Sequence, residues 1–394
     1  MSEPERANHR RRALLGTQCR SVTACVPKGA PVSGDPQLNE IGFYTLAGHS
    51  GTPRDLVGEV VDAERLGLGS VFVSERFNAK DAAVLSGAAG AVSSTLGVAT
   101  AATNHNTRHP LVTATFATTM HRLTGGRFAL GLGRGFDPLF DVIGLPRITM
   151  AQIEDVVGIL RRLWAGEAVL GHDGPAGRFP YLQQDPTFAE DIPVMLVALG
   201  ERTLEFAGRV ADGVVLHTFF TNEALARCVA AVRRGAETAG RDPAAVRVWS
   251  VLATVGDHID EELRLRKLAG RLGTYLQGYG DVLVRANGWD PDELARIRQT
   301  DVMTGARGAL DATATVDELR ALDEVLPREW LAASATGTPE QCAARVLDQY
   351  AAGADAVILH GATPAELAPV VAAYRRVRPE ASVAGAAANP GRTG

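Results

Sequence analysis

Polar and charged side chains follow most of the short apolar runs in this sequence, and their types are those that carry out chemistry. Histidine and glutamate exchange protons, whereas arginine stays protonated and can hold an anion. His105 and His109 are four residues apart, but Pro110 argues against the shared helical face that a metal site needs. We therefore expect acid–base or anion-binding chemistry without a metal. The candidates are His49, Glu75, Arg76, Thr103, His105, Arg134, Glu201, Thr203, His217 and His360.

A glycine-rich stretch, TGGRFALGLGRG at residues 124–135, is a second unusual feature. Gly131, Gly133 and Gly135 alternate, so in a strand they share one face. One interpretation is that this face lets a flat ring approach the backbone. The other is a tightly packed interior with a turn at Gly135. A phosphate-binding P-loop is excluded because no Lys-Ser/Thr pair follows.

Eight short apolar runs are the elements that must position these residues. Such runs are typical of parallel strands buried on both faces. Helical segments such as Pro53–Leu66, Ile148–Trp164 and Thr338–Ala352 separate them, which predicts a (β/α)8 barrel with its site at the carboxyl ends of the strands. A doubly wound sheet is the alternative, but TLAGHSGTP after the first run lacks the expected GxGxxG. The runs are Ile41–Leu46, Ser70–Ser74, Leu96–Ala102, Phe128–Leu132, Pro193–Ala198, Val214–Thr218, Val248–Val255 and Ala356–His360.

The sequence outside these runs indicates how the chain is organised. Residues 1–38 lack periodicity and are expected to form a disordered arm before a barrel at residues 39–378. The barrel carries a Gly/Pro-rich excursion at Gly171–Ile192 and a helical insertion at about 258–328. The low-complexity tail, residues 379–394, is expected to be disordered as well.

Composition excludes several classes of protein. The net charge of -5 argues against a nucleic-acid-binding surface. The four cysteines show no CxxC or His-paired spacing, so structural zinc and a disulfide framework are not expected. No apolar run is long enough to span a bilayer, and the apolar stretch near the amino terminus is too short for a secretory signal. A cytoplasmic enzyme acting on a small molecule is the expectation, with a homodimer left open as its assembly.

One long block carries a resemblance to a known family. Residues 99–135, ATAATNHNTRHPLVTATFATTMHRLTGGRFALGLGRG, resemble the bacterial luciferase-like superfamily of flavin- and deazaflavin-dependent oxidoreductases. They are most similar to its branch that uses coenzyme F420, an 8-hydroxy-5-deazaflavin, and the similarity extends over about residues 40–375. The resemblance implies a luciferase-like TIM barrel and hydride transfer between F420 and a small organic substrate. The alternatives are a monooxygenase that uses reduced FMN and oxygen, and a non-enzymatic binding protein.

The resemblance also implies which residues hold the cofactor. A non-proline cis peptide in a β-bulge behind the ring matches Ala101–Ala102, next to Thr103. Arg134, between Gly133 and Gly135, matches an arginine that binds the flavin phosphate in luciferases, although many deazaflavin enzymes have threonine there. VALGERTLEFAGRVADG matches the segment whose helix amino terminus receives that phosphate, because unpaired N–H groups and the helix dipole attract an anion. Its cofactor-binding residues are Leu199, Gly200 and Thr203, and Glu201 is expected to point away.

The catalytic candidates follow the second strand, in SERF. The family often has a carboxylate followed by histidine there, near the reactive ring. Glu75 fits the carboxylate, but Arg76 replaces the histidine, which argues against a luciferase-type base and for orienting an anionic substrate. An ion pair between Glu75 and Arg76 at the start of a loop is the alternative. His49 and His105 complete the catalytic set.

Overall fold

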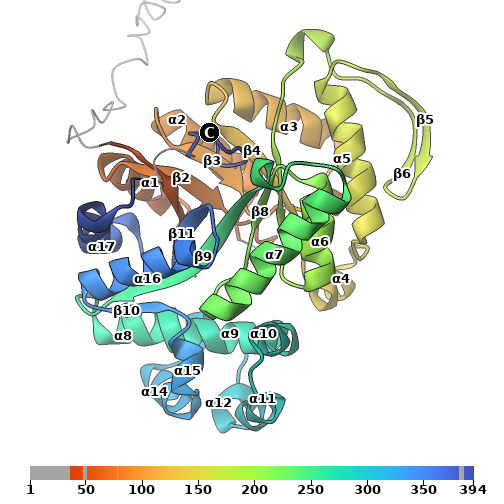
Figure 1. The fold of residues 1–394 in the computed structure, drawn as a ribbon. Coiled ribbons are helices and arrows are strands. Elements are labelled where there is room, and N and C mark those ends of the chain that lie inside the picture. The colour runs from red at the N-terminus through yellow and green to blue at the C-terminus, as the bar shows by residue number, and fades with distance from the viewer. Residues whose placement is uncertain (1–35, 48–50, 78, 381–385) are drawn as a thin grey trace, which may run out of the picture.

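The computed structural model describes residues 36–47, 51–77, 79–380 and 386–394. Eight parallel strands form a closed barrel in the order β9-β11-β1-β2-β3-β4-β7-β8, and pairing of β8 with β9 closes it (Figure 1). Each of the eight predicted strands is present, so the predicted (β/α)8 barrel is confirmed. The strands are β1 Leu38–Tyr44, β2 Leu68–Val73, β3 Gly97–Thr100, β4 Phe128–Gly133, β7 Val194–Val197, β8 Gly213–Val215, β9 Arg247–Gly256 and β11 Ala356–His360.

Helices cover the outside of the barrel. Several begin at a capping box, in which a threonine side chain accepts from a backbone N–H and a glutamine or glutamate returns the bond. Thr149 with Gln152 and Thr338 with Gln341 are two examples, the second as the sequence predicts. The main helices are α1 Asp55–Arg65, α2 Ala82–Val92, α3 Pro110–Leu123, α4 Asp137–Ile143, α5 Met150–Trp164, α6 Glu201–Val210, α7 Asn222–Thr238, α16 Pro339–Ala351 and α17 Pro364–Val377.

The excursion predicted around 171–192 is an antiparallel hairpin between α5 and β7. Its strands are β5 Val169–Gly174 and β6 Gly177–Leu182, and Figure 1 shows it projecting beside α5. A hydrogen bond fixes it there, because His172 Nε2 lies 2.9 Å from Asp155 Oδ2 of that helix. The hairpin is therefore tied to the outside of the barrel along α5, and Phe179 of β6 also packs against His109 at the start of α3.

The helical insertion follows the carboxyl end of β9 and lies as a group on one side of the barrel in Figure 1. A short strand, β10 Ala335–Gly337, pairs with that end of β9 and returns the chain to α16. Stacked Trp289 and Trp330, with ring centroids 4.6 Å apart, join the two halves of the insertion. Its elements are α8 Glu261–Leu265, the π-helical turn η5 Arg266–Gly270, α9 Arg271–Gly278, α10 Gly280–Asn287, α11 Pro291–Arg298, α12 Asp301–Thr304, α13 Leu310–Thr313, α14 Val316–Val325 and α15 Arg328–Leu331.

The tail prediction is wrong for residues 386–394, which fold against the amino-terminal end of the barrel. The reason is Arg247 at the start of β9, a side chain buried completely. Its guanidinium donates to the carbonyls of Ala387, Asn389 and Arg392, at 3.0–3.3 Å, and to Asn39 O at 2.8 Å. Burial lowers the pKa of Arg247 to about 10. The tail is ordered because it supplies acceptors to a buried cation.

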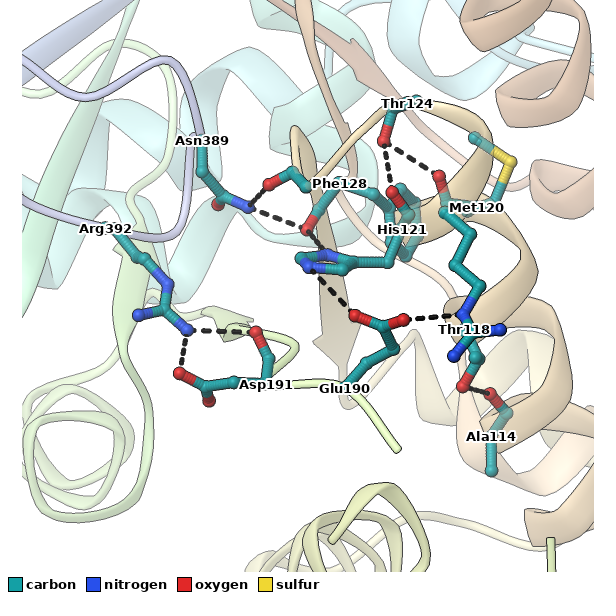
Figure 2. Close-up of polar contacts among 12 residues, drawn as sticks. Ala114, Thr118, Met120, His121, Thr124, Phe128, Glu190, Asp191, Asn389 and Arg392 are labelled. Atoms are coloured by element: carbon teal, nitrogen blue, oxygen red, sulfur yellow. Dashed lines mark hydrogen bonds and ion pairs between the residues drawn. The ribbon is translucent and has the colours of Figure 1, made fainter. Parts of the chain in front are cut away.

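Further contacts hold the tail across several strands. Asn389 Nδ2 donates to Gly126 O at 2.7 Å and to Phe128 O at 2.9 Å, at the start of β4 (Figure 2). Arg392 pairs with Asp191 ahead of β7, also visible in Figure 2. The segment thus closes the end of the barrel opposite the predicted site. An amino-terminal arm is predicted for residues 1–38, and residues 1–35 of it lie outside the described residues.

Candidate active site

The carboxyl ends of the strands bring most of the predicted residues to one end of the barrel. Arg76 follows β2, Thr103 follows β3, Gly135 follows β4, Gly200 follows β7, and His360 ends β11. His49 lies outside the described residues. The amino acid types that were expected to do chemistry therefore share one end of the fold, where barrel enzymes place their sites.

The third strand ends in the predicted irregularity. The peptide bond Ala101–Ala102 is cis. Hydrogen bonds hold this segment from both neighbouring strands: Ala101 N–H donates to Val73 O at 2.7 Å and Thr103 N–H donates to Gly131 O at 3.0 Å. The bulge expected from the resemblance is therefore present and fixed between β2 and β4.

The glycines of β4 make room for this bulge. A Cβ at Gly131 would lie 1.8 Å from Thr100 O, and one at Gly133 would lie 3.0 Å from Ala102 Cβ. Gly135 has a φ of +70° and forms the turn after the strand. The interpretation of a tightly packed interior with a turn at Gly135 is confirmed, because the space beside Gly131 and Gly133 is filled by the chain itself.

Glu75 is held in an ion pair, but its partner is not Arg76. Arg108 Nη2 lies 2.6 Å from Glu75 Oε1, and Arg108 Nη1 donates to Glu75 Oε2 at 3.1 Å. Thr103 Oγ1 donates to the same carboxylate. The Glu75 side chain is 5% exposed. The alternative expectation of a Glu75–Arg76 ion pair is therefore corrected. Arg108 was missed because nothing local in the sequence links two residues 33 positions apart.

Arg76 and Lys80 face one another across a tight loop after β2. Backbone hydrogen bonds in both directions join them, at 2.9 and 2.8 Å. Lys80 Nζ donates to Leu46 O at 3.0 Å and to Ser74 Oγ at 3.2 Å. Burial lowers the pKa of Arg76. Burial also lowers the pKa of Lys80, and with the neighbouring charges of Arg76 and Arg271 it brings that pKa to about 8. Sequence reasoning found Arg76 but missed Lys80.

A second arginine reaches this end of the barrel from the insertion. Arg271 Nη2 lies 2.7 Å from Asp311 Oδ2, and both side chains are almost fully buried. Thr274 Oγ1 donates to Asp311 Oδ1 at 2.8 Å, which fixes the carboxylate. The guanidinium carbon of Arg271 lies 5.9 Å from the ring centroid of Tyr275. Because Arg271 belongs to a segment with no strand pattern, no local pattern predicts that it lies here.

Two histidines and two tyrosines line the same region. His360 meets Tyr44 edge to face with ring centroids 5.2 Å apart, and His217 meets Tyr275 at 4.6 Å. Burial lowers the pKa of both histidines, and nearby Arg271 lowers that of His360 further. Both rings are therefore neutral at pH 7. Burial raises the pKa of Tyr44, which keeps its hydroxyl protonated.

His105 lies in a short 3-10 turn, His105–Thr107, after the bulge. Its Nε2 atom is buried without a hydrogen-bond partner among the described residues. Burial lowers its pKa, so the ring is neutral. The turn is anchored by the neighbouring Asn104, whose Nδ2 donates to Gly133 O at 2.7 Å.

A pocket of about 540 Å³ opens at the amino terminus of α6, at the predicted anion site. The first N–H groups of a helix and its dipole favour an anion. Glu201 pairs with Arg234 at 2.9 Å and is 74% exposed, but it is also one of the residues that line the pocket. The lining residues are Leu199, Gly200, Glu201, Arg202, Thr203, Leu204, Ala224, Arg227, Cys228, Ala231, Val282, Arg285 and Ala286.

Arg134 does not line this pocket. Its Nε donates to Ile148 O at 3.1 Å, and its Nη2 lies 3.7 Å from Asp137 Oδ2. The side chain is 43% exposed. Arg202, Arg227 and Arg285 instead bring positive charge to the pocket from three helices, α6, α7 and α10, and the sequence pattern did not single out any of them.

The described residues contain neither a cluster of metal ligands nor a membrane-spanning helix. No three His, Cys, Asp or Glu side chains in this part of the chain come together as metal ligands could. Within the same ranges, every helix is too short or too polar to cross a membrane.

This chain is similar in sequence and fold to several known proteins. The 5,10-methylenetetrahydromethanopterin reductase of Methanolobus tindarius is 28% identical over 287 residues, 72% of this chain and 83% of that protein. The F420-dependent glucose-6-phosphate dehydrogenase of Beutenbergia cavernae is 32% identical over 189 residues, 44% of this chain and 55% of that protein. The coenzyme F420 dependent tetrahydromethanopterin reductase of Methanopyrus kandleri has the same fold, with a TM-score of 0.71 at 19% identity, over 84% of this chain and 97% of that one. A model described as luciferase-like monooxygenase matches residues 38–385, and the chain therefore belongs to that family.

Proposed function

We propose that this protein is a coenzyme F420-dependent oxidoreductase that exchanges a hydride between the deazaflavin and a small organic substrate. The observation that carries the proposal is the pocket at the amino terminus of α6, which lies at the same end of the barrel as the β3 bulge. Two of the similar proteins are F420-dependent by name.

The residues of this pocket fit an anionic cofactor tail. The N–H groups at the start of α6 can donate to a phosphate, and Gly200, without a side chain, leaves them accessible. Thr203 can add a hydroxyl donor. Arg202, Arg227 and Arg285 supply the positive charge that a tail with phosphate and carboxylate groups requires. Ala101 and Ala102 of the bulge would hold the ring of the cofactor.

The chain's own residues then control the proton that accompanies the hydride. F420, when bound, supplies a ring carbon that accepts or releases the hydride. Glu75 is committed to Arg108 and serves to position the bulge through Thr103. His360 is neutral and buried, and its Nδ1 atom has no hydrogen-bond partner among the described residues. It is our candidate for holding the proton.

Titration of the purified protein with F420, and separately with FMN, tests the proposal. Absorbance and fluorescence report binding of each cofactor. We expect F420 to bind in the micromolar range or tighter and FMN to bind more weakly. The reduced F420 complex should then react slowly with oxygen, because a deazaflavin has carbon in place of N5.

The alternative is a monooxygenase that uses reduced FMN, which the description of the matched family favours. It predicts FMN binding without F420 binding, and rapid oxygen consumption by the reduced complex. That combination of results would overturn our proposal and leave the family assignment intact.

A further inference from the structure

Four side-chain rings come together beside the carboxyl ends of β4 and β8. Phe136 follows β4, His217 lies just beyond β8, and Tyr275 and Tyr279 come from α9 and its carboxyl end in the insertion. The ring centroid of His217 lies 4.6 Å from that of Tyr275 and 5.9 Å from that of Tyr279, and Phe136 and Tyr279 are 5.1 Å apart. We call these four residues the aromatic cluster.

The side-chain amide of Asn287 holds the insertion in place beside β8. Its Nδ2 donates to Phe219 O at 2.9 Å, and its Oδ1 accepts from Thr221 N–H at 2.9 Å. Phe219 has a φ of +62°, which a non-glycine residue rarely adopts, and its ring centroid lies 6.1 Å from that of Tyr275. Such backbone outliers persist where the surrounding structure enforces them, and they gather at functional sites. The fold therefore fixes the insertion against the loop that carries His217.

The two ring nitrogens of His217 have different roles. Nδ1 lies 3.0 Å from Thr218 O. Because a carbonyl oxygen only accepts, Nδ1 is the nitrogen that carries the proton. Burial lowers the pKa of His217, so the ring is neutral at pH 7 and Nε2 keeps its lone pair. Nε2 has no hydrogen-bond partner among the described residues, and the side chain is only half-buried, so this acceptor is available to a ligand.

The hydroxyl groups of Tyr275 and Tyr279 are also available. Neither hydroxyl has a hydrogen-bond partner in the part of the chain that the structure describes, and both residues are half-buried. Burial raises the pKa of Tyr279 to about 12, so its hydroxyl stays protonated and can donate as well as accept. Tyrosine hydroxyls that leave bulk water normally find a partner. The aromatic cluster therefore combines apolar ring surfaces with three polar atoms that a ligand can satisfy.

The aromatic cluster adjoins both parts of the proposed cofactor site. Thr103 at the bulge pairs with Leu132 of β4, the strand that Phe136 follows. β7, which leads into α6 and the tail pocket, lies between β4 and β8 in the barrel. α10 begins directly after Tyr279, and its Arg285 lines that pocket. A molecule bound by the aromatic cluster would therefore lie next to the cofactor.

The chemistry of the aromatic cluster selects the class of ligand. Ring surfaces favour an apolar or aromatic body. The lone pair of His217 Nε2 requires a hydrogen-bond donor, and the tyrosine hydroxyls suit a group that also accepts. Arg271 lies beside Tyr275, but its guanidinium is paired with Asp311 at 2.7 Å, so its charge is already balanced. A neutral hydroxyl group meets these requirements better than a carboxylate does.

We propose that the aromatic cluster binds a ring-shaped, uncharged part of the substrate, and that His217 Nε2 accepts a hydrogen bond from a hydroxyl group on it. This inference rests on the proposed function and names the class of substrate, a cyclic or aromatic molecule that carries a hydroxyl group. His217 selects the substrate in this proposal, and His360 remains the candidate for holding the proton.

Ligand-observed NMR titrations with phenol and with anisole test the inference, in protein saturated with F420. The two probes share a ring, but in anisole a methyl group replaces the hydroxyl hydrogen. We expect phenol to bind about two- to tenfold more tightly than anisole, as for one net hydrogen bond. His217→Phe keeps a ring and removes the acceptor. It should abolish this preference by weakening phenol binding and leave the Kd of anisole unchanged.

Three further variants separate the roles within the aromatic cluster. His217→Gln, whose amide oxygen can accept, should restore part of the preference for phenol. Phe136→Ala removes ring surface alone, so it should weaken phenol and anisole by the same factor, about two- to tenfold. His121→Phe is the matched control, because His121 Nδ1 also faces a backbone carbonyl, Phe128 O at 3.3 Å, at the opposite end of the barrel (Figure 2). It should leave both Kd values unchanged.

Three results would overturn the inference. One is that phenol does not bind to the wild type. Another is that the ratio of the two Kd values is the same in the wild type and in His217→Phe. The third is displacement of F420 by phenol, which would assign the aromatic cluster to the cofactor. Circular dichroism and melting curves establish that each variant is folded.

Failure of the proposed function gives a different result. In that case F420 does not bind, and the two probes are titrated into the protein without cofactor. Loss of the preference for phenol in His217→Phe would still support the aromatic cluster as a binding site for such a molecule. An unchanged ratio of the two Kd values would refute it.

Discussion

Residues 386–394 offer the sharpest test of what holds the barrel together. Deleting them removes three of the four carbonyl acceptors of Arg247 and also the acceptor of Trp249, whose Nε1 donates to Pro390 O at 2.7 Å. The guanidinium carbon of Arg247 lies 4.5 Å from the centroid of the Trp249 ring, so the two side chains share this environment. The deletion therefore leaves a buried cation with one protein acceptor.

The expected loss can be worked out from these bonds. Four hydrogen bonds at about 1 kcal/mol net each give about 4 kcal/mol. A folded chain of roughly 350 residues has an unfolding entropy near 0.7 kcal/mol/K, so this loss corresponds to a fall in Tm of about 6 °C. Arg247→Met in the full-length chain removes three of the same bonds. A double variant that combines Arg247→Met with the deletion should therefore lose much less unfolding free energy than the sum of the losses in the two single variants.

Differential scanning calorimetry of the wild type, the deletion, Arg247→Met and the double variant measures this coupling. Arg392→Ala is the control, because its ion pair with Asp191 is largely exposed and should contribute little. A fall in Tm below about 2 °C on deletion, or full additivity in the double variant, would refute the account of Arg247 as the residue that orders the tail.

Two further predictions address the opposite end of the barrel. Thr203→Ala should weaken F420 binding by about 1–3 kcal/mol, as expected for a lost hydrogen bond to a charged group. Arg134→Ala should leave F420 binding nearly unchanged. Fluorescence titration with F420 compares the two variants. Gly131→Ala should destabilise the protein or prevent folding, because its Cβ would overlap a β3 carbonyl oxygen, and a normal melting curve would contradict this.

The lowered pKa of Lys80 also has a consequence for the stability of the fold. The pKa of Lys80 is lowered in the folded state from 10.5 to about 8, by burial and by the neighbouring cations, with Glu59 opposing. Between these values the unfolded chain binds more protons, so this residue makes the fold more stable as pH rises from about 8 towards 10.5. Lys80→Gln should remove that increment.

The sequence by itself determined the barrel. Its eight apolar runs match the eight strands, because burial on both faces imposes a local pattern that needs no knowledge of the partners. Helix starts such as Thr338 were also predictable, since a capping box spans only four residues. The resemblance in residues 99–135 added the cis peptide at Ala101–Ala102, which is present.

Only the tertiary structure decided which side chains meet. Glu75 could be placed at a strand end, but its pairing with Arg108 depends on how the segment after β3 folds back. Arg271 reaches the site from an insertion whose packing the strand pattern does not specify. The tail is too short and too low in complexity to predict order, and it folds because Arg247, some 140 residues earlier, is buried and needs acceptors. Local sequence patterns predict helices and strands. The partners of a buried charge, and therefore the free energy of burying it, depend on distant segments that meet only in the tertiary structure.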